Sequence, residues 1–301
     1  MTTALATTAR QVLTGTQRHN NPIPDRLPVS QRPTRLDLAA ADRQTTLDLK
    51  PVAVRVPGIA KEIEVKIASD RLEWEEALQL VTQSYRSRGY EAAETRGLRF
   101  TPFHALPQTT TFVAKHAGRV VATLSLVPDN TLLGLPMECI YGPEVHDLRL
   151  QGRRMGEATS LADSGLGVRE FLQVFVTIIK LTMQYHVRQG GDTWVITVNP
   201  RHRNFYGKVL GFVPLGPCRS YPCVQDAPAE AYRLDLDLMK ANAPAMYETM
   251  FAEALPPAVL SAPRMDANLV RHFGSNSTQT TLRQVQDILG YAEHYGSPRR
   301  W

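Results

Sequence analysis

A histidine and a tyrosine four residues apart, His202 and Tyr206, follow directly on an uncharged segment, 193–198. That segment is rich in β-branched and aromatic residues, which predicts a buried strand. Asn199 can cap a short helix after it and so place His202 and Tyr206 on one helix face near the carboxyl end of the strand. Open sheets have their crevices at such strand ends. The Tyr206 phenol would therefore be placed to donate a proton or a hydrogen bond to a departing group.

A glycine turn lies earlier in the chain, before a helix that apolar residues at helical spacing predict over 168–188. Gly165 and Gly167 stand on either side of Leu166 in this turn. Such a turn exposes backbone N–H groups beside the positive end of the helix dipole, which favours binding of a phosphate. A plain strand-to-helix turn would show the same pattern, so both interpretations stay open.

The string Asn-Pro-Arg-His-x-x-Phe-Tyr at 199–206, with Leu-Gly-Phe at 210–212, resembles the signature of the GCN5-related N-acetyltransferase superfamily. In that superfamily the tyrosine lies beside the departing thiolate. The step from Tyr206 to Gly211 is five residues here, where four is commoner. The further string Gly-Pro-x-Arg-x-Tyr-Pro-x-Val at 216–224 makes the chain look more specifically like the long-chain N-acyl amino acid synthases, which are akin to the acyl-homoserine lactone (autoinducer) synthases.

The resemblance covers roughly residues 61–240 and implies both a fold and an activity. The fold would be α/β with a mixed central sheet, splayed between the strands at 156–162 and 193–198 and flanked by helices, with a helical C-terminal extension. The activity would be transfer of a long-chain acyl group from the thioester of acyl carrier protein to the α-amine of an amino acid. The amine would attack the thioester directly in a ternary complex, with phosphopantetheine carrying the acyl group. No tightly bound cofactor is expected, and acyl-CoA is the alternative donor.

An attacking amine must lose a proton, so a carboxylate within hydrogen-bond or one-water reach is needed. Glu157 is the predicted base, because it opens the strand that bulges beside the thioester in the superfamily, and the related synthases have an Arg-x-x-x-Glu step that Arg153 and Glu157 match. Glu144 is the second choice. The alternative for Glu157 is a structural ion pair with Arg153 or Arg154. His202 could relay a proton, orient the phenol or pair with a phosphate.

The donor-binding residues are inferred in part from the resemblance. Ala162 occupies the Gln/Arg position of the superfamily's pyrophosphate loop, while Gly165 and Gly167 are kept, and this suits the single phosphate of phosphopantetheine. Asn199 belongs to the same site. Arg201 and Arg203, with Lys208, are predicted to contact the acidic helices of a carrier protein. The arginines at 149, 153 and 154 could serve the same face or hold the carboxylate of the amino acid.

Composition limits the other classes of function. The net charge of +5 comes mostly from the first 57 residues, and no nucleic-acid-binding motif accompanies the basic residues, so nucleic acid is not predicted as a partner. The three cysteines show no metal-ligand spacing, which indicates a reducing, cytoplasmic location and no metal site. The apolar stretch 171–187 is interrupted by polar residues and is not predicted to span a membrane.

Three regions are predicted along the chain: a disordered N-terminal segment over 1–57, an acyltransferase domain over 58–240 and a helical extension over 241–301. The long loop at 89–108 is expected to cover the amine site. The last two strands are predicted at 212–215 and 231–238. Two helices are predicted in the extension, near 246–253 and 281–294.

Other functions stay open at this point. A CoA-dependent N-acetyltransferase of a small amine is the first alternative. An acyl-homoserine lactone synthase would require S-adenosylmethionine, and the Asn-Pro-Arg-His string is not the signature of that family. A non-catalytic module that binds a carrier protein or a lipid on the same fold is the third.

Overall fold

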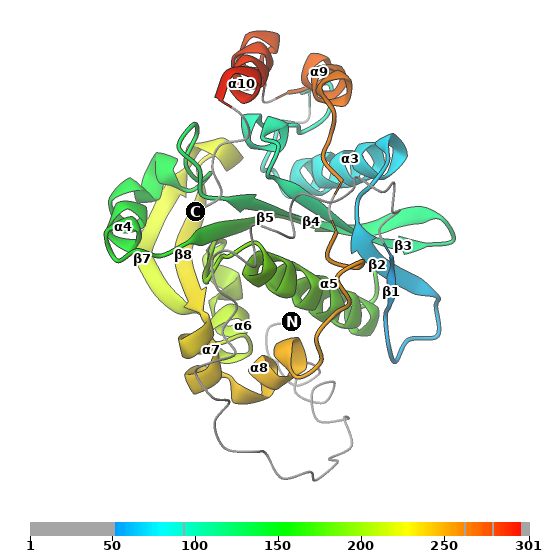
Figure 1. Ribbon diagram of the computed structural model, residues 1–301, viewed down its shortest axis with the longest axis vertical. Helices are drawn as coiled ribbons and strands as arrows, with labels where there is room; N and C mark the ends of the chain where they lie inside the picture. Colours follow the sequence, from blue (N-terminus) through cyan, green and yellow to red (C-terminus); the bar gives the residue numbers. More distant parts are fainter. Residues whose placement is uncertain (1–51, 93, 262, 279, 296–301) are drawn as a thin grey trace.

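The computed structural model describes residues 52–92, 94–261, 263–278 and 280–295, and these residues form one mixed sheet of eight strands with helices on both faces (Figure 1). Neighbouring strands are antiparallel except for β5 and β6, which are parallel. The spatial order is β1 (Val54–Arg55), β2 (Ile63–Ile67), β3 (Thr110–His116), β4 (Arg119–Pro128), β5 (Met155–Asp163), β6 (Thr193–Val198), β8 (Ala227–Asp235) and β7 (Val213–Tyr221). The predicted α/β fold class is confirmed.

The N-terminal segment predicted as disordered falls largely outside the described residues, since the description begins at residue 52. Val54–Arg55 lies within the predicted range and pairs with β2 as the edge strand β1.

Two long helices cover opposite faces of the sheet (Figure 1). Helix α3 (Arg71–Ser87) begins at Asp70, whose carboxylate accepts a hydrogen bond from the Glu73 N–H at 3.0 Å. Helix α5 (Val168–Arg188) coincides with the predicted helix and packs against β2, β3 and β4. A third helix, α4 (Glu138–Leu150), contacts β7 instead. The sheet is thus held between α3 and α5, and the parallel pair β5/β6 lies in its middle.

The parallel strands β5 and β6 separate after a short contact. Their register ends at Glu157 and Val195, although β5 continues to Asp163 and β6 to Val198. On its other edge β5 has a bulge, because its pairing with β4 shifts and Ser160 adopts a left-handed backbone with φ of 55°. The splayed sheet that the sequence predicts is therefore present, and the bulge lies beside the opening.

The last two strands differ from the prediction. Strand β8 ends at Asp235 because the Asp235 carboxylate accepts a hydrogen bond from the Leu238 N–H at 2.9 Å and so starts helix α7 (Leu236–Asn242). Strand β7 continues to Tyr221 past Pro217, with irregular register near Gly216. An edge strand tolerates a proline because one of its sides needs no N–H donor.

The C-terminal extension contains α8 (Pro244–Phe251), α9 (Ala267–Ser275) and α10 (Leu282–Tyr295). The predicted helices near 246–253 and 281–294 correspond to α8 and α10, whereas α9 was not predicted. Helix α8 packs against α5, and α9 and α10 pack against the short 3-10 helix η3 (Pro102–Ala105) on the α3 side of the sheet (Figure 1).

Two backbone hydrogen bonds attach this extension to the loop before η3. The Leu98 N–H donates to the Asn276 carbonyl at 2.7 Å, and the Thr278 N–H donates to the Leu98 carbonyl at 2.9 Å. The rings of Phe100 and Phe273 are fully buried with centroids 5.9 Å apart. The extension therefore fixes the position of the loop on which Arg99 lies.

We expect Phe273→Ala to lower the free energy of unfolding by about 3 kcal/mol, because it leaves a cavity beneath this loop. Chemical denaturation measures the loss. Leu282→Ala is the control, since its side chain is 54% exposed and should change stability little. Equal stability of the two variants would show that the extension does not contribute to the core.

Candidate functional site

Two cavities meet at the opening between β5 and β6. The first, which we name the α5 cavity, has a volume of about 280 Å³ and lies between α5, the end of α3 and the segment after β6. The second, the Glu157 cavity, has a volume of about 250 Å³ and lies under the loop that contains Arg99. The residues that line both are Tyr85, Tyr90, Thr159, Ser160, Thr197, Val198 and Asn199.

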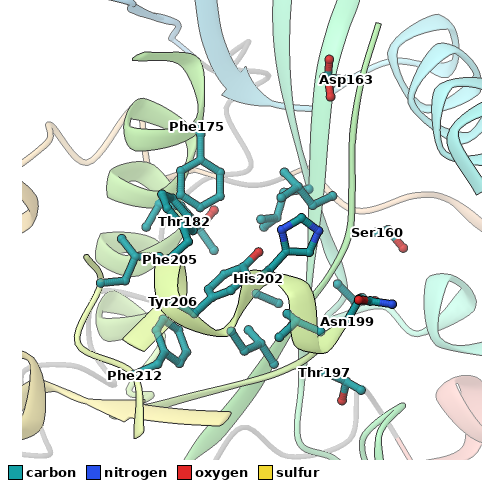
Figure 2. Close-up of a pocket in the computed structure, with 18 of the residues that line it drawn as sticks. Ser160, Asp163, Phe175, Thr182, Thr197, Asn199, His202, Phe205, Tyr206 and Phe212 are labelled. Atoms are coloured by element: carbon teal, nitrogen blue, oxygen red, sulfur yellow. The ribbon is translucent and has the colours of Figure 1, made fainter. Parts of the chain in front are cut away.

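The α5 cavity has a largely apolar wall, and the Tyr206 phenol is among the polar groups that line it. Phe171, Phe175 and Met183 of α5 form one side of it, and Trp194 of β6 forms another. Tyr206 projects into this space from helix α6 (Arg203–Lys208), as Figure 2 shows. Burial, with a smaller contribution from Tyr85, raises the pKa of the Tyr206 phenol to about 12. The phenol is therefore protonated at neutral pH and can act as a hydrogen-bond or proton donor.

The Asn199 segment starts the short helices as predicted. The Asn199 side chain accepts a hydrogen bond from the Arg201 N–H at 3.2 Å, and the 3-10 turn η4 (Pro200–His202) precedes α6. His202 lines the α5 cavity, and its Nε2 accepts a hydrogen bond from Arg201 Nε at 2.9 Å. Burial, Arg201 and Arg88 lower the pKa of His202. A neutral imidazole is thus favoured, which suits orientation of a neighbouring group better than charge pairing with a phosphate.

Glu157 lies on the opposite side of the opening. Successive residues of a strand face opposite sides of a sheet, so Glu157 lines its own cavity while Ala158 lines the α5 cavity. The Glu157 side chain is 2% exposed, and its Oε2 accepts a hydrogen bond from the Met137 N–H at 2.8 Å. Burial raises its pKa to about 8, against the smaller effect of that hydrogen bond. Such a carboxyl group is suited to accept a proton near neutral pH.

The ion pairs weighed for Glu157 from sequence are not formed. Arg153 lies 3.7 Å from the Asp235 carboxylate, and Arg154 lies 3.0 Å from that of Asp192. Arg149 pairs with Asp129 and Glu138.

Glu144, the second choice for the base, has a lowered pKa because Arg219 donates hydrogen bonds to it. It lines neither cavity. Glu157 is therefore the better placed of the two carboxyl groups.

The glycine turn is engaged by a neighbouring carboxylate. Asp163 Oδ1 accepts hydrogen bonds from the Gly165 N–H at 2.9 Å and from the Leu166 N–H at 3.0 Å. Gly167 then precedes the first turn of α5, where its backbone forms the N-cap. Two of the N–H groups that a phosphate could use are thus bonded to an anion, which disfavours a pyrophosphate at this turn.

The structure brings together most of the predicted site residues. Tyr206, His202, Asn199 and Arg201 line the α5 cavity, and Glu157 and Asn199 line the adjoining one. Gly165, Gly167 and Arg203 line neither cavity, and Arg203 pairs with Glu230.

Sequence reasoning missed Arg99, Ser160 and Thr197. Arg99 lines the Glu157 cavity, and the other two line both cavities. The buried Thr197 Oγ1 has no hydrogen-bond partner among the described residues. One signal pointed to Arg99, namely its position in an unusually long loop, 89–108, that was expected to cover the amine site. Nothing in the sequence distinguished Thr197 from its neighbours in the strand.

Two further findings concern the described part of the chain alone. It contains no helix that is both long and apolar enough to cross a membrane. It also contains no group of three or more His, Cys, Asp or Glu residues arranged to hold a metal ion.

Among solved structures, one match is "FeeM, an N-acyl amino acid synthase from uncultured soil microbes". It is 26% identical over 62% of this chain and 99% of that chain, with a TM-score of 0.54. A CoA-dependent acyl-homoserine lactone synthase, BjaI, is 16% identical over 67% of this chain and 96% of that one, with a TM-score of 0.45. No curated protein sequence matches the chain.

The family model for the N-acyl amino acid synthase FeeM matches residues 76–235, which is more than half of the 301 residues. The matched region begins in α3 and ends with β8. It therefore contains β5 and β6, between which the two cavities meet, together with the bulge and α6. The chain is thus an N-acyltransferase, and it belongs to the FeeM family of N-acyl amino acid synthases.

Proposed function

We propose that this protein transfers a long-chain acyl group from the thioester of acyl carrier protein to the α-amine of an amino acid, and that residues 58–240 form the catalytic unit. The observation that carries the proposal is the meeting of an apolar cavity with a cavity that holds a buried carboxyl group, at the opening between β5 and β6. An acyl thioester in the first and an amine in the second would bring the reacting atoms together.

The opening suits the amide-containing arm of phosphopantetheine. Strand β5 has no pairing with β6 beyond Glu157, so backbone N–H and C=O groups of both strands face the gap. An extended chain with amides can pair with such groups as a strand would. Arg88 and Arg201 line the α5 cavity and are exposed, which would allow them to contact the phosphate at the end of the arm.

The reaction would require no covalent enzyme intermediate. Glu157 would accept a proton from the amine, whose nitrogen forms the C–N bond by attack on the thioester carbon. The bulged backbone at Ser160 would lie near the developing oxyanion. As the C–S bond breaks, Tyr206 would donate its proton to the thiolate sulfur. The products are an amide and a free thiol. Of the two protons that the ammonium group loses, one passes to solvent, and the one taken by Glu157 returns to Tyr206 through solvent, which restores both side chains.

The glycine turn favours a carrier protein over free CoA. Coenzyme A presents a pyrophosphate, whereas phosphopantetheine on a carrier presents one phosphate. The Asp163 carboxylate already holds two N–H groups of the turn, which leaves fewer donors for a second phosphate. Acyl-CoA is the second candidate donor, and it is distinguished by experiment.

The test is incubation of the purified protein with palmitoyl carrier protein, palmitoyl-CoA or acetyl-CoA and a mixture of amino acids, with detection of N-acyl products by mass spectrometry. We expect product from palmitoyl carrier protein at a kcat/KM on the order of 10²-fold above that for palmitoyl-CoA, since the protein contacts of the carrier are lost with CoA. Product from acetyl-CoA alone would replace the proposal with a small-acyl transferase. No product from any donor would favour a binding module.

A further inference from the structure

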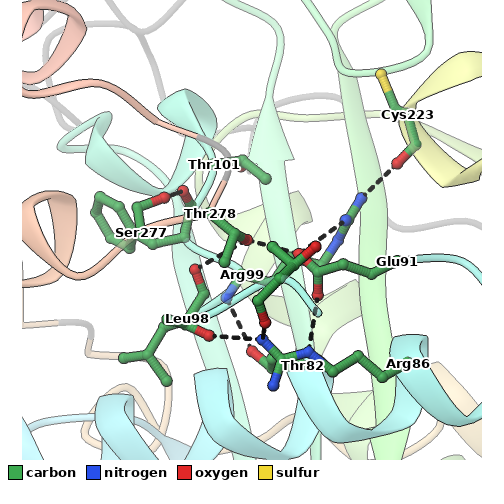
Figure 3. A network of polar contacts seen from close by, with 12 residues as sticks. Thr82, Arg86, Glu91, Leu98, Arg99, Thr101, Cys223, Ser277 and Thr278 are labelled. Atoms are coloured by element: carbon green, nitrogen blue, oxygen red, sulfur yellow. Dashed lines mark hydrogen bonds and ion pairs between the residues drawn. The ribbon is translucent and has the colours of Figure 1, made fainter. Parts of the chain in front are cut away.

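We infer that Arg99 binds the α-carboxylate of the acceptor and makes the Glu157 cavity selective for free amino acids with uncharged side chains. This rests on the proposed function for the acceptor site. Arg99 is 6% exposed and lines the cavity from the loop that the C-terminal extension holds in place (Figure 3).

The Arg99 guanidinium is held in place but has few hydrogen bonds. Its Nη2 donates to the Cys223 carbonyl at 2.8 Å, and its carbon lies 4.3 Å from the centroid of the Tyr85 ring. Its Nη1 has no hydrogen-bond partner among the described residues. The backbone N–H of Arg99 donates to Thr82 Oγ1 at 2.8 Å, which anchors the loop to α3.

Arg99 forms a long ion pair with Glu91, which leaves its Nη1 without a hydrogen bond to any described residue. Glu91 Oε1 lies 4.0 Å from Arg99 Nη1, beyond hydrogen-bond distance. The same oxygen accepts a hydrogen bond from Thr278 Oγ1 at 2.6 Å, and the other Glu91 oxygen lies 3.9 Å from Arg86. A buried guanidinium with unused donors is costly, and a carboxylate in the cavity would supply acceptors of fitting geometry.

The charges of the cavity complement an amino acid zwitterion. Among the Asp, Glu, Lys and Arg residues of the described chain, Arg99 and Glu157 alone line this cavity. Glu157 is the proposed acceptor of the amine proton, so Arg99 provides the opposite charge for the carboxylate. The arginines at 149, 153 and 154, which the sequence also suggested for this role, are paired with acidic side chains elsewhere.

The rest of the wall defines the class of side chain. Pro102, Phe103, Pro136, Val224 and Pro228 contribute apolar surface to the cavity. A charged side chain would lose hydration there without gaining a partner, so the acceptor is an amino acid with an uncharged side chain.

Three amines of matched shape test the inference: leucine, leucinamide and 3-methylbutylamine, the last two lacking the carboxylate. For the wild type with palmitoyl carrier protein, we expect kcat/KM for leucine to exceed that for either analogue by roughly 30-fold or more. Arg99→Gln should lower kcat/KM for leucine by a similar factor and change the analogues little. Arg99→Lys should recover part of the preference, because it keeps the charge without the planar fork.

Arg86→Gln is the matched control. Arg86 contacts the same Glu91 carboxylate but lines neither cavity, so this variant should keep the preference for leucine even if its stability falls. Binding of leucine and leucinamide is also measured by calorimetry, which needs no turnover.

The two proposals can fail separately. A wild type that acylates leucinamide as well as leucine, or an Arg99→Gln protein that keeps the preference, overturns the inference and leaves the acyltransfer intact. Wild-type protein that binds leucine through Arg99 but forms no product overturns the proposed function alone. Should Arg99→Gln not fold, the wild-type comparison of the three amines and the Arg99→Lys variant still test whether Arg99 binds the carboxylate.

Discussion

Glu157→Gln is expected to lower kcat by on the order of 10³-fold, because an amide cannot accept the proton of the amine. The glutamine carbonyl can still accept the hydrogen bond that the Met137 N–H donates at 2.8 Å, so the backbone there should keep its position. Rates of N-acyl product formation at saturating donor and amine measure the loss.

The pH dependence of the wild type follows from the buried position of Glu157. Its pKa is raised to about 8, and the base must be deprotonated, so kcat/KM should fall as the pH falls below about 8. The amine also titrates in this region. The residual activity of Glu157→Gln therefore serves as the reference, because its profile reflects the amine alone.

The same pKa shift affects stability. The folded protein binds the Glu157 proton up to a pH of about 8, whereas the unfolded chain releases it near 4.5. The contribution of Glu157 to the free energy of unfolding is thus fully present below pH 4.5 and is lost as the pH rises to about 8. Denaturation at several pH values should show wild type losing stability relative to Glu157→Gln across this window.

Glu144→Gln is the matched control for these measurements. Glu144 pairs with Arg219 and lines neither cavity, so its loss should leave kcat unchanged. A Glu157→Gln enzyme as fast as Glu144→Gln would exclude Glu157 as the base.

Tyr206→Phe is expected to lower kcat by on the order of 10²-fold, because the thiolate would leave without a proton donor. The ring remains in contact with Phe205 and Phe212, with centroids 5.4 and 5.9 Å away, so the helix should fold normally. The rate of thiol release, followed with a thiol reagent, measures the effect.

The leaving group provides a sharper test of Tyr206. An aryl thioester releases a more acidic thiol that needs no proton. With that donor, the kcat of Tyr206→Phe should therefore approach that of the wild type. Tyr247→Phe makes the same chemical change on α8, away from both cavities, and should leave every rate unchanged. An equal loss with both thioesters would assign Tyr206 a packing role.

Parts of the fold could be predicted because local sequence determines them. The strand Thr193–Val198 is uncharged and rich in β-branched residues, the helix Val168–Arg188 has apolar residues at helical spacing, and both were predicted with their observed bounds. The predicted strand end at residue 238 was wrong, because the Asp235 carboxylate caps α7 and ends the strand, whereas the apolar pattern continues into α7.

The site residues also differ in whether the local sequence could predict them. Asn199 and Tyr206 come from one continuous segment, so their spacing could be read directly. Arg99 could not be recognised, because its environment combines Glu91 of its own loop with Tyr85 on α3 and Cys223 after β7. Whether an arginine is buried with unused hydrogen-bond donors depends on contacts that the linear sequence does not contain.

The gap between β5 and β6 also determines how a product would leave. In the proposed reaction the acyl tail lies in the α5 cavity and the amino acid head lies in the Glu157 cavity. The N-acyl amino acid would therefore extend through the opening between β5 and β6. The thiol arm occupies the same opening and must withdraw first. Release would therefore be ordered, with the carrier leaving before the N-acyl amino acid.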